Sequence, residues 1–187
     1  WKYYQWGNNY GFPFTWNVTT SNARVNASSY WPWNYYSSST FITVNSDPYD
    51  WSSVRNDNLW WWVTWTNAAM QWPAPTWYHV PPSSEWVALC GILTSTFGMA
   101  SNATTMGTYL KMPPAGVRSS SSSSVGGAGS SGDYWSSTPF STTSAYFLIF
   151  DAPGLNPQNI SSRAYGYSVR CFKNEAVQPD DSRTKLY

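Results

Sequence analysis

Residues 133–172 read DYWSSTPFSTTSAYFLIFDAPGLNPQNISSRAYGYSVRCF, and this stretch decides the fold class. Two parts of it, Ala145–Phe150 and Gly166–Phe172, are rich in Tyr, Phe, Ile and Val, which favour strands, and the second also alternates. Between them, Asp151–Tyr165 holds Pro-Gly and Asn-Pro dipeptides, which are typical of turns. The stretch therefore predicts short strands joined by turns.

Helical signals are few, and the best of them is Ser83–Leu93. Two prolines precede this segment, Ser83 or Ser84 can cap it, and Glu85 suits the first turn of a helix. Its apolar residues recur at spacings of three and four, which predicts one buried face. Two shorter helices are expected at Thr66–Gln71 and Ala103–Leu110.

The remaining segments predict irregular structure. Residues 1–66 are crowded with Trp, Tyr, Asn and Ser and show no helical period, although Thr40–Val44 and Trp60–Thr66 suit short strands. Residues 119–132 are almost entirely Ser and Gly, which predicts a flexible loop within one domain of residues 1–173. Residues 174–187 are expected to form a polar tail.

Composition narrows the function classes. Only 10% of the 187 residues are charged and the net charge is +1, so the clustered cations that nucleic-acid binding requires are missing. No apolar run approaches the roughly 18 residues that span a bilayer, so direct membrane insertion is not expected. Aromatics reach 19%. A polar, aromatic and charge-poor surface favours an extracellular or cell-surface location.

No constellation for catalysis stands out, and we expect no enzyme and no cofactor. The single histidine, His79, is interpreted as a structural, hydrogen-bonded residue because it has no partner set. Asp47, Asp50 and Asp57 are close enough in sequence to suggest structural calcium, but turn and cap duty is the preferred interpretation. The two cysteines are compatible with one disulfide or with two buried free thiols.

Three motifs carry a resemblance to a known group. Tyr134–Thr138 reads YWSST, Ala145–Phe150 reads AYFLIF, and Arg163–Cys171 reads RAYGYSVRC. Upstream, Tyr78–Pro81 reads YHVP and is followed by Glu85, Trp86 and Leu89. In motif order and spacing, residues 60–173 resemble bacterial proteins with a C-type-lectin fold. These include the Fibrobacter major paralogous domain and the variable proteins of diversity-generating retroelements.

The resemblance implies an α+β domain with a C-type-lectin-like fold of the formylglycine-generating-enzyme type. Such a domain has two or three short helices, short antiparallel strands and long irregular loops. In the variable proteins of that group, the ligand-contacting positions lie between the YWSS and SVRC motifs, here within residues 139–165. The positions of this chain that match are Phe140, Ser141, Thr142, Thr143, Phe147, Ile149, Asp151, Ala152, Pro153, Gly154, Ile160, Ser161, Ser162 and Tyr165.

Strand alternation predicts that Phe147 and Ile149 face outward while Tyr146, Leu148 and Phe150 pack inward, although the opposite facing is also compatible. The leading hypothesis is a variable surface or phage-borne receptor that binds a protein or glycan on another cell surface. Two alternatives stay open. One is a carbohydrate-binding adhesin that uses Trp31, Trp33 and Tyr35, and the other is a structural subunit of a surface layer or filament.

Overall fold

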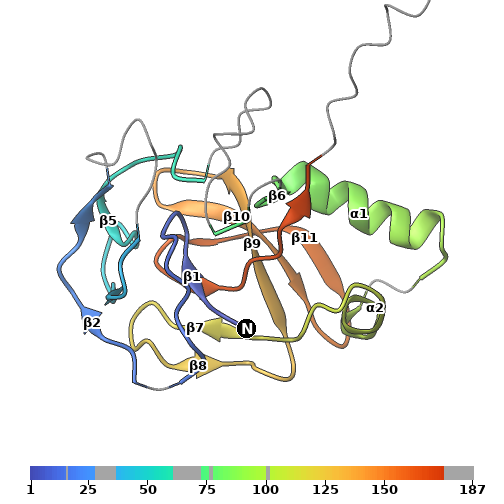
Figure 1. The fold of residues 1–187 in the computed structure, drawn as a ribbon, viewed down its shortest axis with the longest axis horizontal. Coiled ribbons are helices and arrows are strands. Elements are labelled where there is room, and N and C mark those ends of the chain that lie inside the picture. The colour runs from blue at the N-terminus through green and yellow to red at the C-terminus, as the bar shows by residue number, and fades with distance from the viewer. Residues whose placement is uncertain (16, 28–36, 61–72, 76–77, 100–101, 175–187) are drawn as a thin grey trace, which may run out of the picture.

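The computed structural model describes residues 1–15, 17–27, 37–60, 73–75, 78–99 and 102–174. Within these residues the chain is an α+β structure with two helices and many short strands, arranged in several small and mostly antiparallel sheets (Figure 1). The expected α+β class is therefore confirmed. The expected helix at Thr66–Gln71, most of the strand at Trp60–Thr66 and nearly all of the polar tail lie outside the described residues.

The longest strands form one antiparallel sheet near the C-terminus. Its order is β11-β10-β9, so β10 is the central strand. The bounds are β9 Gly132–Pro139, β10 Ser144–Phe150 and β11 Leu155–Ser162. The strand expected at Ala145–Phe150 is confirmed. By contrast, β11 lies where turns were expected, because its Asn and Pro residues are turn formers that still tolerate an edge strand.

Helix α1, Ser83–Ser95, packs against all three strands of this sheet. It buries Trp86, Cys90 and Leu93, which confirms the expected helix and its apolar face. The expected serine cap is wrong, because the N-cap position is Pro82, which makes no side-chain cap bond. Thr138 of β9 takes that role instead, since its Oγ1 accepts a hydrogen bond from the Ser83 N–H at 3.0 Å.

Helix α2, Ala103–Tyr109, confirms the second expected short helix. The Asn102 side chain caps it by accepting a hydrogen bond from the Thr105 N–H at 3.1 Å. The Ala103 N–H donates to the carbonyl of Asp151 at 2.9 Å, which fixes the start of α2 beside the turn between β10 and β11. Asn is a favoured N-cap residue, so this boundary follows from the local sequence.

The second face of the sheet is covered by the N-terminal half of the chain. Trp135, Ala145 and Phe147 point into a core that also contains Trp6 and Trp51. A second core on the α1 side is built from Trp86, Cys90, Leu93, Met106, Met112, Tyr134, Leu148 and Phe150. Strand β10 is therefore buried on both faces, between α1 and the N-terminal half.

The N-terminal strands are short and pair mainly with distant segments. Their bounds are β1 Tyr4–Gln5, β2 Thr20–Ser21, β3 Val25–Asn26, β4 Phe41–Ile42 and β5 Ser52–Val54. Strand β4 covers two of the five residues of the strand expected at Thr40–Val44, so that strand is shorter than expected. β2 pairs with β4 and β3 with β5, both in parallel. Strands of two or three residues give little ladder bonding, so side chains complete the hydrogen bonding here.

The last set of strands brings the two ends of the described chain together. The four-stranded sheet has the order β1-β12-β7-β8, with β7 Val117–Arg118, β8 Val125–Gly126 and β12 Gly166–Tyr167. Strand β6, Tyr78–His79, pairs with β13, Phe172–Lys173. The single strand expected at Gly166–Phe172 is thus divided into β12 and β13. The Ser/Gly segment 119–132 contains the β7–β8 turn and β8.

Candidate functional site

The fourteen expected contact positions fall mainly at two opposite ends of strand β10. Phe140–Thr143 connect β9 to β10, and Asp151–Gly154 connect β10 to β11. Because β10 has seven residues at about 3.3 Å each, the two connections lie roughly 20 Å apart. The positions therefore do not form a single surface, and each end has its own geometry.

Backbone and side-chain hydrogen bonds hold the β9–β10 connection. The N–H groups of Phe140 and Ser141 both donate to the carbonyl of Ser144, at 3.0 and 3.1 Å. The Ser141 hydroxyl accepts from the Thr143 N–H at 3.3 Å and from the Ser144 N–H at 3.2 Å. A turn bonded in this way presents its outer side chains from a fixed backbone.

Arg163 lies under this turn and is almost fully buried. Its guanidinium donates to the Ser141 carbonyl at 2.6 Å and to the Asp57 carboxylate at 2.6 Å, and lies 4.5 Å from the Trp6 ring centroid. Burial would raise the pKa of Asp57, but the hydrogen bonds from Arg55 and Arg163 outweigh it and hold that pKa below its usual value. The turn therefore rests on a buried guanidinium that is ion-paired with Asp57.

Three large side chains gather at this end of the sheet. Phe140 is 52% exposed and makes an edge-to-face contact with Tyr146, with ring centroids 5.3 Å apart. Ile160 of β11 is 42% exposed and stands directly opposite Tyr146 in the sheet register. The β9–β10 turn and the end of β11 contribute hydroxyl residues at the same end of the sheet. We call the whole set the Phe140 surface: Phe140, Tyr146 and Ile160 with Ser141, Thr142, Thr143, Ser161 and Ser162.

Contacts from other segments fix the hydroxyl side of the Phe140 surface. The Ser161 hydroxyl accepts a hydrogen bond from the buried Tyr167 hydroxyl at 2.7 Å. The Ser162 hydroxyl donates to the carbonyl of Tyr49, a residue that is itself 49% exposed. Tyr146 and Tyr49 are neighbours that the sequence analysis missed. Tyr146 was assigned to the inward set, and nothing near Tyr49 in the sequence points to β11.

The other end of β10 forms a separate, shallow pocket of about 290 Å³ beside α2. Asp151, Pro153 and Gly154 line it, together with Ile149. The Asp151 carboxylate accepts from the Gly154 N–H at 3.1 Å, which closes the turn. Ala152 is exposed next to this pocket. This end therefore holds five of the expected positions, away from the Phe140 surface.

Three of the expected positions pack inside the molecule or against its core, and one of them is Ile149, which is half-buried against the same core as Phe147, so its outward facing is also wrong. Phe147 is 4% exposed and lies 4.6 Å from Tyr167 by ring centroids, so the expectation that it faces outward is wrong. The reason is that β10 has no free face, so alternation cannot identify an outer side. Tyr165 is half-buried and stacks on Tyr167 with centroids 6.0 Å apart.

His79 is buried, and both of its ring nitrogens have partners. Nδ1 lies 2.7 Å from the Asn174 Oδ1 and Nε2 lies 2.7 Å from the Glu85 Oε2. Burial lowers its pKa, but the bonds to Glu85 and Asn174 outweigh this effect and leave the pKa above its usual value. The expected hydrogen-bonded state is confirmed, but the expectation that His79 has no partner set is wrong, because Glu85 and Asn174 flank its ring, which ties the start of α1 to the segment after β13.

The acidic and thiol groups also have structural surroundings. The Asp50 carboxylate accepts from the Ser52 N–H at 3.1 Å, and Asp57 pairs with Arg163, so these two do turn and ion-pair duty. In the described part of the chain, no group of three or more His, Cys, Asp and Glu could hold a metal ion. Cys90 and Cys171 are free, and burial raises the pKa of each thiol to about 11.

The three segments that carry the resemblance meet in space. The Trp135 N–H donates to the Ser168 carbonyl at 3.0 Å, which joins the YWSST segment to the SVRC segment. His79 of the YHVP segment stands opposite Phe172 in the β6–β13 register, and Phe172 directly follows the SVRC segment. The residues Trp31, Trp33 and Tyr35 of the alternative adhesin hypothesis lie outside the described residues.

Comparison of the chain with protein-family models, with curated proteins and with solved structures gave no match. Among the described residues, neither helix has the length and apolar character needed to cross a membrane.

Proposed function

We propose that this chain is a ligand-binding domain with a C-type-lectin-like fold, which binds a protein or glycan on another cell surface through the Phe140 surface. The observation that carries the proposal is the exposed Phe140 on a turn that a buried arginine supports, in contact with Tyr146, which stands opposite the exposed Ile160. Exposed apolar groups with polar rims mark binding surfaces more often than they occur by accident.

The composition of the surface supports the same function. Aromatic side chains offer large contact areas at low entropic cost, while Ser and Thr add adaptable hydrogen bonds, as in antibody loops. A binding surface also needs a rigid support. Arg163 and the hydrogen bonds of Ser141 supply that support beneath the turn. In this proposal the half-buried Tyr146 orients the more exposed Phe140.

The fold part of the proposal is supported by the contacts between the motif segments. Chains of the variable-protein type hold their diversified positions between two fixed segments. Here those segments are hydrogen-bonded to each other through Trp135 and Ser168, and these two residues are buried. Substitutions on the Phe140 surface would leave that framework intact. We therefore infer a receptor whose turn residues vary while its framework does not.

The direct test is binding by the whole chain to a glycan array and to an array of purified cell-surface proteins. The Phe140→Ser/Ile160→Ser variant removes two exposed apolar side chains from the Phe140 surface. Its matched control is Val87→Ser/Ile92→Ser, which removes two similarly exposed side chains from α1. We expect specific hits that the first variant loses, by about tenfold or more in affinity, and that the control retains.

Hits retained by the Phe140 variant, or no hits on either array, would contradict the proposal. Self-assembly at low concentration without any hit would favour the structural-subunit alternative. The variable-receptor part has its own test, which is sequencing the 3′ end of the gene and its flanks in related genomes. A near-copy of codons 134–172 that differs only at adenines, beside a reverse transcriptase, is expected. A fixed 3′ end in a lone gene would contradict it.

A further inference from the structure

The basic residues of this charge-poor chain have an uneven distribution. The structure describes eight of the ten Lys and Arg residues. Arg118 and Arg163 are buried, Arg24 donates to backbone carbonyls, and Arg55 pairs with Asp57. All of the others line two adjoining pockets on one side of the molecule: Lys2, Lys111, Arg170 and Lys173.

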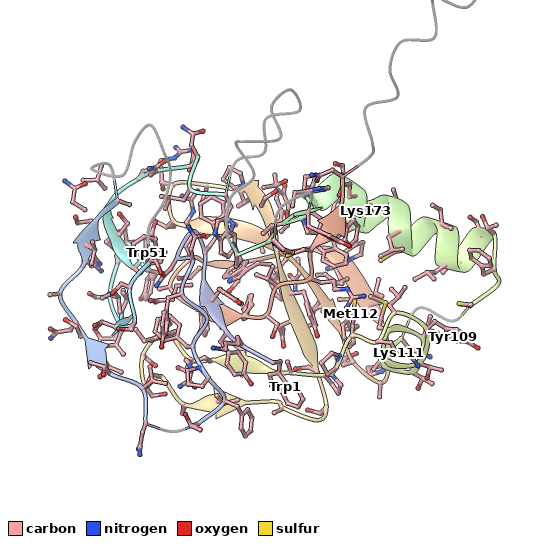
Figure 2. All side chains as sticks on the ribbon, in the orientation of Figure 1. Trp1, Trp51, Tyr109, Lys111, Met112 and Lys173 are labelled. Carbon is pink, nitrogen blue, oxygen red and sulfur yellow. The ribbon has the colours of Figure 1, made fainter. Side chains whose placement is uncertain are left out.

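The two pockets are neighbours, because they share lining residues. The first, of about 180 Å³, is lined by Lys2, Lys111 and Arg170, and the second, of about 360 Å³, by Arg170 and Lys173. Met112 and Arg170 belong to both. Figure 2 shows Met112 and Lys111 beside helix α2, and Lys173 on the strand next to α1. We call the two together the basic groove.

The floor of the larger pocket is apolar. Leu89 comes from α1, Leu110 and Met112 come from the segment after α2, and Phe172 comes from β13. A volume of about 360 Å³ lies within the range of small-molecule sites, which is roughly 300–1,000 Å³. Such sites are mostly apolar with a few placed polar groups, and this pocket has that character.

Within the described part of the chain, no carboxylate compensates the charges of the basic groove. Among the described residues, no acidic side chain lines either pocket, and no ion pair involves Lys2, Lys111, Arg170 or Lys173. A concave surface lined by charges of one sign concentrates ligands of the opposite sign. The groove therefore combines uncompensated positive charge with an apolar floor.

We propose that the basic groove binds a small amphiphilic anion, namely a carboxylate attached to a linear alkyl chain. The carboxylate lies at Arg170, where the guanidinium offers a paired set of donors, with Lys111 nearby in the first pocket. The alkyl chain lies along the floor formed by Leu89, Leu110, Met112 and Phe172. This site does not depend on the Phe140 surface, so either proposal can fail without the other.

Calorimetric titration of the whole chain with octanoate tests the site. Acetate has the same charge without the chain, and 1-octanol has the chain without the charge. We expect octanoate to bind at least about tenfold more tightly than either, because only octanoate uses both parts of the groove. Binding by octanol equal to that of octanoate, or no binding of octanoate, would overturn the proposal.

A pair of variants locates the binding. Arg170→Gln removes the central cation, and Arg55→Gln removes an exposed arginine outside the groove with the same change in net charge. Octanoate binding should fall at least about tenfold in the first and stay unchanged in the second. Equal affinities in the two variants would overturn the assignment. If the chain bound anionic vesicles but not octanoate, the small-ligand proposal would be overturned, and the ligand of the groove would be a membrane surface.

Cys171 offers a second measurement, because it lines the larger pocket. In a Cys90→Ala background it is the chain's remaining thiol, and its reaction with a small thiol reagent at pH 9 can be timed. Octanoate should slow this reaction by about the fraction of sites that it fills. An unchanged rate at saturating octanoate would place the ligand elsewhere.

Discussion

The N-terminal segment, residues 1–60, and the three-stranded sheet, residues 132–162, bury similar aromatic side chains but satisfy their backbones differently. In the sheet, strands of seven and eight residues form ladders. In the N-terminal segment, strands of two or three residues leave most bonding to side chains such as Gln5 and Ser52. Polar side chains in the N-terminal segment therefore supply hydrogen bonds to the backbone that strand ladders supply in the three-stranded sheet.

The largest effect should come from the sheet core, where Phe147→Ala removes a buried ring between Trp135 and Tyr167. We expect a loss of about 4 kcal/mol in the free energy of unfolding, because the cavity adds to the lost transfer energy. Urea unfolding measures it. Ile160→Ala on the same sheet is the control and should cost about 1 kcal/mol or less. Similar losses in the two variants would contradict the buried position of Phe147.

The next effect should come from the residue that joins the two regions. Arg163→Met leaves Asp57 and the Ser141 carbonyl without their buried donor, and the expected loss is about 3 kcal/mol. Arg55→Met, which removes the exposed partner of the same carboxylate, should cost far less, because solvent screens an exposed ion pair. Equal values by urea unfolding would show that the two regions are not joined through Arg163.

The N-terminal segment should also show the stronger dependence on pH. Burial raises the pKa of Asp50 to about 6, although the Ser52 N–H and Arg163 act in the opposite direction. The unfolded chain loses this proton near pH 3.8 and the folded chain near 6, so stability falls as pH rises between these values. The fall is expected to be roughly 2–3 kcal/mol.

The Asp50→Asn variant keeps the acceptor for Ser52 and removes the titration. Urea midpoints at pH 4, 5.5 and 7 should therefore change less in this variant than in the original chain. If the two chains show the same pH dependence, ionisation of Asp50 does not lower the free energy of unfolding. The N-terminal segment would then not be the more pH-sensitive of the two regions.

The smallest of these effects concerns Gln5, which has three bonds to distant backbone groups. Its side chain donates to the carbonyls of Ile42 and Ala164 at 2.8 Å each and accepts from the Ile42 N–H at 2.9 Å. Gln5→Ala should cost about 2 kcal/mol, because these buried groups lose their partner. Gln158→Ala on exposed β11 should lie within about 0.5 kcal/mol of the original chain. Equal costs would remove the distinction between the regions.

Local signals predicted the elements whose causes are local. Helix α1 follows from the spacing of its apolar residues, α2 from Asn102, and β10 from its run of strand-forming residues. The side-chain hydrogen bond to the Ser83 N–H at the start of α1 comes from Thr138, more than fifty residues away. The sequence contains no sign of that contact. The short N-terminal strands also depend on distant partners, which periodicity cannot show.

The candidate site was predictable only in part, for a similar reason. The resemblance identified Phe140–Thr143 and Ile160–Ser162, which do lie together at one end of the sheet. It grouped them with Asp151–Gly154, because sequence distance does not reveal that β10 separates the two turns. The facing of Phe147 failed because alternation assumes one free face, whereas α1 and the N-terminal core cover both.

Strand β11 has a consequence for how copies of the chain behave when concentrated. Within the described residues no strand pairs with its outer edge, and such open edges invite other chains to add strands and aggregate. Pro157 lies in the middle of β11 and has no N–H to offer, and an irregularity of register next to it bends the pairing with β10. Pro157 made this strand hard to predict from the sequence. The same residue also disfavours edge-to-edge association between copies of the folded chain.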